Sequence, residues 1–220
     1  MKISIKKETS VDTIPYETES GSFYSKISIY PAREHYGIEP VCNITASLLC
    51  KNKIVSQMKA TSLKVIESTP NPLDNAAAYG CQDLIKVVMD VASDLDDIYT
   101  KSVKSVFSNE EDFFSDQIIL IKSLKVRDKY WGFNFPKELM TSFLHNAAGN
   151  CSLVVMEIPK EEMPMQSIYW ADIGFKPLIL SNYLVLTTFS HPWLNKLESK
   201  KQKSYYKNDE PYPPLTLVRD

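Results

Sequence analysis

The chain has 220 residues and a formal net charge of −2, and 44% of its residues are hydrophobic. This length suffices for one sizeable hydrophobic core. The charge argues against a general nucleic-acid binder, which normally carries a basic surface, and no apolar run approaches the length of a membrane span. Because the charged N-terminus also lacks the apolar core of a signal peptide, we expect a cytoplasmic protein that binds neither nucleic acid nor a membrane.

Cysteine usage gives no indication of a metal site. The four cysteines are not in CxxC spacing, and only three histidines are available to complete a ligand set. Their neighbours are apolar or small, which is typical of buried free thiols in a reducing compartment. We therefore expect no bound metal.

The first third of the chain carries patterns typical of β-strands. The alternation of apolar and polar residues predicts strands, and a polar pair at 51–52 between two β-rich runs predicts a hairpin. The expected strands are 2–7, 22–30, 41–50 and 53–67, with a polar loop over 8–21 and another loop over 31–40.

Helical spacing replaces this pattern after the sequence STPNP at 68–72. Apolar residues at Leu84, Val87, Val88 and Val91 recur at the intervals of one helix face. The remaining elements alternate between strand and helix. We expect helices over about 74–93 and 95–107, a strand from 117 to 126, a helix from Pro136 to Gly149, a strand over 151–158, a helix over 165–173 and a strand over 183–189.

This order predicts an α+β fold, with a mixed and mostly antiparallel sheet flanked by helices. A strand, a helix and a second strand in succession predict one parallel pair in the second half. We expect a single domain over residues 1–195. From residue 196 onward lysine, glutamate, serine and tyrosine dominate, and we interpret residues 196–220 as a polar C-terminal tail.

The stretch from 117 to 149 carries the clearest functional signal. Its apolar run Ile118–Ile121 is typical of a strand that is buried on both faces. An aromatic loop over 127–135 follows, and Pro136 is suited to the first turn of a helix. A strand that leads through a loop to a helix N-terminus presents free N–H groups and the positive end of the helix dipole to an anion.

Two motifs in this half resemble the GCN5-related N-acetyltransferase (GNAT) superfamily. The first is Val126-Arg-Asp-Lys-Tyr-Trp-Gly-Phe-Asn-Phe-Pro, where the family has Arg/Gln-x-x-Gly-x-Gly/Ala after a strand that ends in valine. The second is Trp170-Ala-Asp-Ile-Gly-Phe, where the family has Tyr-x-x-x-Gly-Phe. The resemblance covers about residues 117–190, and it implies a GNAT-like domain.

The resemblance implies a cofactor, a reaction and a binding loop. The cofactor would be acetyl-CoA or another acyl-CoA, and the reaction would transfer the acetyl group to an amine of a small molecule or a protein. The end of the strand would contact the cofactor, with a backbone N–H near Leu124–Val126 stabilising the oxyanion, and the loop would hold the pyrophosphate. The cofactor-binding residues implied are Leu124, Val126, Trp131, Gly132, Phe133, Asn134 and Phe135.

The sequence departs from the family pattern in either register of the loop. With Gly132 as the first loop glycine, Lys129 stands in place of Arg/Gln and Asn134 in place of the second glycine. In the other register Trp131 replaces Arg/Gln, Asn134 and Pro136 replace both glycines, and Pro136 removes an N–H donor.

Trp170 occupies the position of the tyrosine that many members use as general acid, and an indole cannot supply a proton. Tyr169 beside it is a candidate acid, although packing in the core or in a groove also explains this pair.

Glu157 is the candidate general base. A carboxylate on a strand beside a cleft can accept a proton from an ammonium group, whereas an exposed acid at a strand end is the ordinary alternative. Positioning two bound substrates supplies much of the rate in direct acyl transfer, so neither Glu157 nor Tyr169 is strictly required.

Two other classes of function remain open. One is a GNAT-like protein that has lost catalysis and binds a ligand or a protein, and the other is an unrelated α+β interaction protein. Binding of coenzyme A would separate the GNAT-like proteins from an unrelated interaction protein. Turnover with an amine would separate an active enzyme from a GNAT-like protein that only binds. The sequence is also compatible with a homodimer.

Overall fold

The computed structural model describes residues 7–9, 16–18, 21–31, 41–65, 72–91, 101–107, 117–130, 133–148, 152–179 and 181–188. These residues form one sheet and two groups of helices. The strands are β1 (Lys7–Thr9), β2 (Tyr16–Thr18), β3 (Gly21–Pro31), β4 (Val41–Cys50), β5 (Lys53–Lys64), β6 (Gln117–Val126), β7 (Ser152–Glu157), β8 (Lys176–Pro177) and β9 (Tyr183–Thr187). The helices are α1 (Pro72–Ala78), α2 (Gln82–Val91), α3 (Lys101–Val106), α4 (Phe135–Ala147) and α5 (Met163–Ala171), with a 3₁₀ turn at Asp128–Tyr130.

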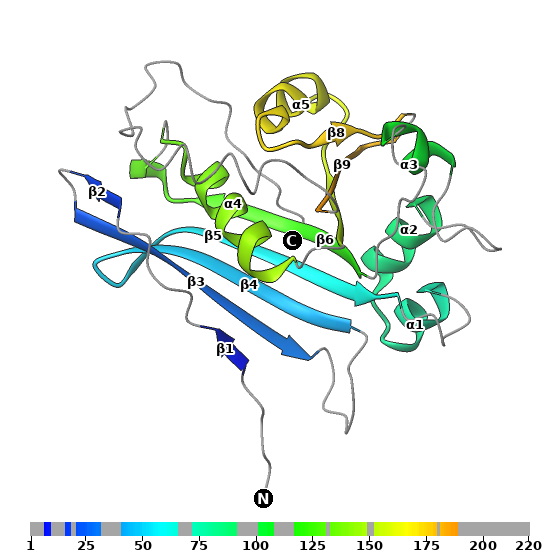
Figure 1. Ribbon diagram of the computed structural model, residues 1–220, viewed down its shortest axis with the longest axis horizontal. Helices are drawn as coiled ribbons and strands as arrows, with labels where there is room; N and C mark the ends of the chain where they lie inside the picture. Colours follow the sequence, from blue (N-terminus) through cyan, green and yellow to red (C-terminus); the bar gives the residue numbers. More distant parts are fainter. Residues whose placement is uncertain are drawn as a thin grey trace, which may run out of the picture.

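The strand order in the sheet is β1-β3-β4-β5-β6-β7-β9-β8, and β2 pairs with the first residues of β3 (Figure 1). Every described pairing is antiparallel except that of β6 with β7. This arrangement confirms the predicted α+β class, with a mostly antiparallel sheet and one parallel pair in the second half.

The predicted hairpin is present between β4 and β5. Its two turn residues, Lys51 and Asn52, have φ angles of 49° and 63°. Positive φ at both central positions matches the right-handed twist of the flanking strands, and asparagine adopts this conformation readily. The turn fixes the register of the pairs Cys50↔Lys53 and Leu49↔Ile54, and a bulge then shifts it before Leu48↔Ser56.

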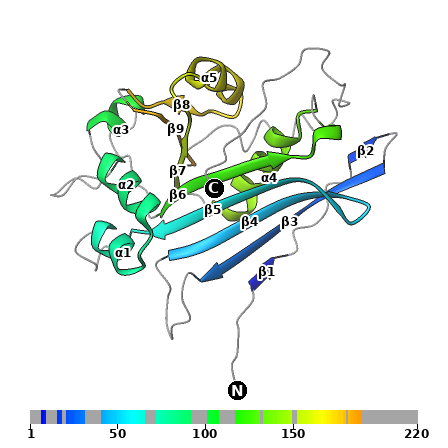
Figure 2. The same ribbon diagram turned by 180° about the vertical axis from the view of Figure 1, so that it is seen from behind.

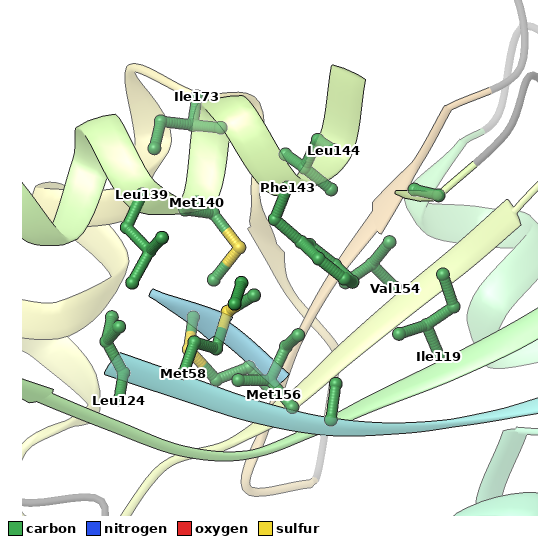
Figure 3. Packing of buried hydrophobic residues seen from close by; sticks show 14 of the residues in the cluster. Met58, Ile119, Leu124, Leu139, Met140, Phe143, Leu144, Val154, Met156 and Ile173 are labelled. Atoms are coloured by element: carbon green, nitrogen blue, oxygen red, sulfur yellow. The ribbon is translucent and has the colours of Figure 1, made fainter. Parts of the chain in front are cut away.

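Hydrophobic clusters cover both faces of the sheet. Helix α4 lies in front of the central strands in Figure 1 and behind them in Figure 2. Leu139 and Met140 of this helix point toward Leu124 and Met58 of the sheet, and the ring of Phe143 points toward Val154 of β7 (Figure 3). Helices α1, α2 and α3 pack on the opposite face, where their apolar side chains meet Ile118 and Leu120 of β6 and Leu153 and Val155 of β7.

Two predictions about the first half were wrong. The single helix expected over 74–93 is broken into α1 and α2, because Gly80 adopts a φ of 65° that ends the first helix. The loop expected over 8–21 contains residues of β1 and β2, which pair with β3. Short edge strands of this kind depend on the neighbouring strand for their hydrogen bonds, so local sequence does not specify them.

Smaller differences occur in the second half. Helix α4 begins at Phe135, one residue before the predicted start, and the short strand β8 was not predicted. Helix α5 begins at Met163, two residues early, and Gly174 follows its end with a φ of 105°. The predicted tail over 196–220 lies outside the described residues. Across the described ranges, no helix has both the length and the apolar character needed to cross a membrane.

The packing of α4 against the sheet gives a prediction for stability. Phe143 is fully buried, so Phe143→Ala should leave a cavity between α4 and the sheet and lower the free energy of unfolding by about 3–5 kcal/mol. Urea denaturation of the purified protein measures this. His145→Ala on the exposed side of the same helix is the matched control and should change stability by no more than about 0.5 kcal/mol. Equal effects of the two substitutions would contradict the packing described here.

Candidate functional site

The parallel strands β6 and β7 pair over only part of their lengths. The last pair in their register is Ile121↔Met156, whereas β6 continues to Val126. Strand β7 instead stays with β9, and just after it the N–H of Ile158 donates a hydrogen bond of 2.7 Å to the carbonyl oxygen of Asn182. We call this divergence the fork, bounded by Lys122–Val126 on one side and Glu157–Ile158 on the other.

A β-bulge marks the start of the fork. The register between β5 and β6 shifts between Lys59↔Ser123 and Ala60↔Ile121, so that Lys122 is the extra residue of β6. Bulges bend a strand and redirect its groups, and they are common beside functional sites. Here the bulge occurs where β6 leaves β7.

The pairing with β5 fixes where the backbone amides of β6 point. The N–H of Arg127 donates to the carbonyl oxygen of Val55 at 3.0 Å, so Val126 and Ser56 form a non-hydrogen-bonded pair. In an antiparallel strand, alternate residues direct their N–H groups to opposite edges. The N–H groups of Val126 and Leu124 therefore face the side that β7 has left. This is the orientation expected for the predicted oxyanion donors.

Aromatic rings pack together where the loop meets α4. The rings of Phe133 and Phe135 stack with centroids 5.1 Å apart, and the edge of Tyr130 meets Phe135 at 5.9 Å. Phe135 is buried against the cluster on the α4 face. The two central loop residues of the predicted binding set, Trp131 and Gly132, lie outside the described residues.

The N-terminus of α4 lacks a side-chain cap. Asn134 occupies the N-cap position without a capping hydrogen bond, and its Oδ1 is buried with no hydrogen-bond partner among the described residues. Pro136 in the first turn contributes no N–H. An N-terminus that its own residues leave uncapped can interact with a ligand, although it offers one donor fewer than a glycine-rich loop.

A lysine in the first turn of α4 links this end of the helix to α5. Lys137 Nζ lies 2.8 Å from Asp172 Oδ2 and 4.5 Å from the centroid of the Tyr169 ring. The Lys137 side chain is only 18% exposed, whereas that of Asp172 is 72% exposed. Tyr169, the candidate acid, is therefore held by a cation–π contact on the α4 side of the sheet.

Trp170 is a core residue. It is fully buried, and its Nε1–H donates to Gln166 Oε1 at 3.1 Å. Gln166 is itself buried and donates to Glu162 at 3.3 Å. The indole N–H therefore has its hydrogen-bond partner inside the protein. At the position where the GNAT pattern has a tyrosine, this chain has a buried tryptophan.

Glu157 lies on the other face of the sheet. Its Oε1 accepts a hydrogen bond of 3.0 Å from Lys86 Nζ of α2. Two further contacts join α2 to the strands around the fork: Lys122 lies 3.6 Å from Asp83, and the Tyr183 hydroxyl donates to Asp90 at 2.9 Å. The candidate base and the candidate acid are thus not brought together, because Tyr169 is on the α4 side.

Sequence reasoning missed the partners of both candidate residues. Lys86 belongs to a helix far from Glu157 in the sequence, and no local pattern connects them. Lys137 offered a weak signal, because a cation in the first turn opposes the helix dipole and needs an anionic neighbour. That neighbour, Asp172, lies inside the second motif.

Comparison of the chain with protein-family models, with curated proteins and with solved structures returned no match. The fork, the loop and the start of α4 are therefore interpreted from their own geometry. Among the described residues, no cluster of three or more histidine, cysteine, aspartate or glutamate side chains could hold a metal ion.

The hydrogen bond between Trp170 and Gln166 can be tested by a double-mutant cycle. Gln166→Met should leave the buried indole N–H unpaired and lower the free energy of unfolding by about 1–3 kcal/mol. In a Trp170→Phe background, which lacks that donor, the same substitution should cost distinctly less. Chemical denaturation of the four proteins measures the coupling, and strictly additive costs would contradict the pairing.

Proposed function

We propose that this chain is an acyl-CoA-dependent N-acyltransferase, which transfers an acetyl group from acetyl-CoA to an amine on a small molecule or a protein. The divergence of β6 from β7 carries the proposal. It opens an edge of β6 at the point where the strand runs into the loop and the N-terminus of α4.

This arrangement supports one orientation of the cofactor. The pyrophosphate would lie against the loop around Gly132 and the first turn of α4, where the helix dipole favours an anion. The pantetheine arm, which has amide groups, would follow the edge of β6 into the fork. The Leu124 N–H then faces the place where negative charge develops on the thioester oxygen.

Charge near α4 is consistent with an anionic ligand. Lys137 carries a positive charge in the first turn, and the aromatic rings of Phe133 and Phe135 give the loop a rigid apolar base. Lys137 is paired with Asp172, whose side chain is 72% exposed. An incoming phosphate would compete with this carboxylate for the ammonium group.

Glu157 is the better of the two candidate catalytic groups. It lies at the end of β7, at the edge of the fork, and its side chain is 27% exposed. A carboxylate there can remove the proton that an acceptor ammonium must lose before its nitrogen attacks. The ring of Tyr169 contacts the Lys137 ammonium, and we propose that Tyr169 positions Lys137 near the N-terminus of α4 and does not transfer a proton.

A second candidate function is a GNAT-like protein that binds acyl-CoA or a partner without turnover. The burial of Trp170 at the position of the family's acid and the pairing of Glu157 with Lys86 favour this alternative, because both side chains are already engaged in internal contacts. The unrelated interaction protein is the outcome that remains if coenzyme A does not bind.

Calorimetric titration with acetyl-CoA tests the proposed binding site. Wild-type protein should bind with micromolar affinity, about −8 kcal/mol. Gly132→Glu should weaken binding by about 100-fold, because a carboxylate beside the pyrophosphate repels it. Ala78→Glu adds the same charge on the exposed side of α1, on the other face of the sheet, and should bind as wild type does. Failure of well-folded wild-type protein to bind would reject the proposal.

Turnover then separates the enzyme from the binding protein. Release of the coenzyme A thiol is followed with a panel of primary amines, and Glu157→Gln should lower kcat/KM for a responding amine by about 100-fold while leaving acetyl-CoA binding intact. Tyr169→Phe keeps the ring under Lys137 and should have little effect. Binding of acetyl-CoA without amine-dependent thiol release would support the catalytically inactive alternative.

A further inference from the structure

Helix α2 crosses the sheet at the point where β6 and β7 diverge, and it contacts both strands. Its polar edge presents Asp83 to β6, Lys86 to β7 and Asp90 to β9. Of these three side chains, only Lys86 carries an amine. The structure therefore places a primary amine of the chain at the fork, on the face opposite α4.

The contact made by Lys86 resembles that of a bound substrate. Its Nζ is 3.0 Å from Glu157 Oε1, which is hydrogen-bonding distance from the carboxylate that we propose as the general base. The Lys86 side chain is 57% exposed, so the ammonium is accessible and its ion pair is weak enough to open and reform.

We propose that Lys86 is an acyl acceptor, so that the protein acylates itself at this position. The inference rests on the proposed N-acyltransferase function and identifies one substrate amine of the same site. It concerns the ε-amine of this chain, and an external amine would have to displace Lys86 from Glu157 in order to use the same base.

The reaction is an ordinary aminolysis of a thioester. Glu157 accepts one proton from the Lys86 ammonium, and the neutral nitrogen forms a bond to the thioester carbonyl carbon. The carbon–sulfur bond then breaks, coenzyme A leaves as its thiolate, and the second proton from nitrogen neutralises that sulfur. The first proton passes from Glu157 to water, and the products are an amide at Lys86 and free coenzyme A.

Two other lysines, Lys122 and Lys64, serve for comparison. Lys122 projects from the bulge itself and is paired with Asp83 at 3.6 Å. Lys64 is exposed at the end of β5 that pairs with Gln117, at the opposite end of β6 from the fork. Lys64 therefore reports the rate at which acetyl-CoA acylates an ordinary surface lysine without catalysis.

Acylation of Lys86 would change the site. The amide carries no positive charge, so the ion pair between Lys86 and Glu157 is lost.

The test is incubation of the full-length protein with isotopically labelled acetyl-CoA, followed by intact-mass measurement and peptide mapping. Label should accumulate at Lys86 about 100-fold faster than at Lys64, as expected for a positioned amine with a general base. The rate should be independent of protein concentration, because the reaction occurs within one molecule. Lys86→Arg should abolish the fast phase, and Lys160→Arg, an exposed control after β7, should leave it unchanged.

Glu157→Gln distinguishes catalysis from simple exposure. This variant should slow labelling of Lys86 by about 100-fold, toward the rate at Lys64. Labelling of Lys86 no faster than that of Lys64, or a fast phase that persists in Glu157→Gln, would overturn the inference. Calorimetry on the same samples identifies what has failed: acetyl-CoA binding without labelling of Lys86 rejects the self-acylation alone, and absence of binding rejects the proposed function with it.

Discussion

Burial of Ile118–Ile121 on both faces of the sheet is the constraint on which the structure depends. Each of these side chains is withdrawn from water, which contributes roughly 1.5–3 kcal/mol apiece. Both faces must be covered, so α4 packs on one side and α2 on the other. Beyond Ile121 the continuous burial of β6 ends at Lys122, and the strand bulges and leaves β7. The fork is therefore located where the requirement for two-sided burial stops.

The two helical layers also determine which charged groups meet at the fork. On the α4 side, Lys137 links Asp172 to the ring of Tyr169, and on the α2 side Lys86 pairs with Glu157. A partner of opposite charge or an aromatic face stabilises each lysine. The Lys86 side chain is 57% exposed, and a surface pair of this kind holds by little more than about 1 kcal/mol. A ligand that carries an ammonium group can exchange with this pair at modest cost. This is why an occupied Glu157 is compatible with function here.

Periodicity predicted most of the elements but not their limits. The alternation in 22–30 and 41–50 and the two-residue turn between β4 and β5 predicted the first half of the sheet, because side-chain spacing and turn chemistry are local properties. The break between α1 and α2 at Gly80 was missed because the apolar residues that indicated the helix, from Leu84 to Val91, all lie in α2. The role of the binding loop stays a prediction, because its central residues Trp131 and Gly132 lie outside the described residues. Glu157 and Tyr169 were both identified as candidates, but their location on opposite faces was not predicted.

The sequence by itself determined the α+β class, the order of the elements and the strand that forms one side of the fork. These features follow from interactions between residues close together in the chain. Only the tertiary structure decided that β7 leaves β6 after Met156 and that Lys86 meets Glu157. The fork and the lysine pair join segments that are distant in sequence, whereas Gln166 lies one helical turn before Trp170 in α5 and is within local reach of the indole N–H. Packing of whole elements, and not local propensity, sets the contacts between distant segments.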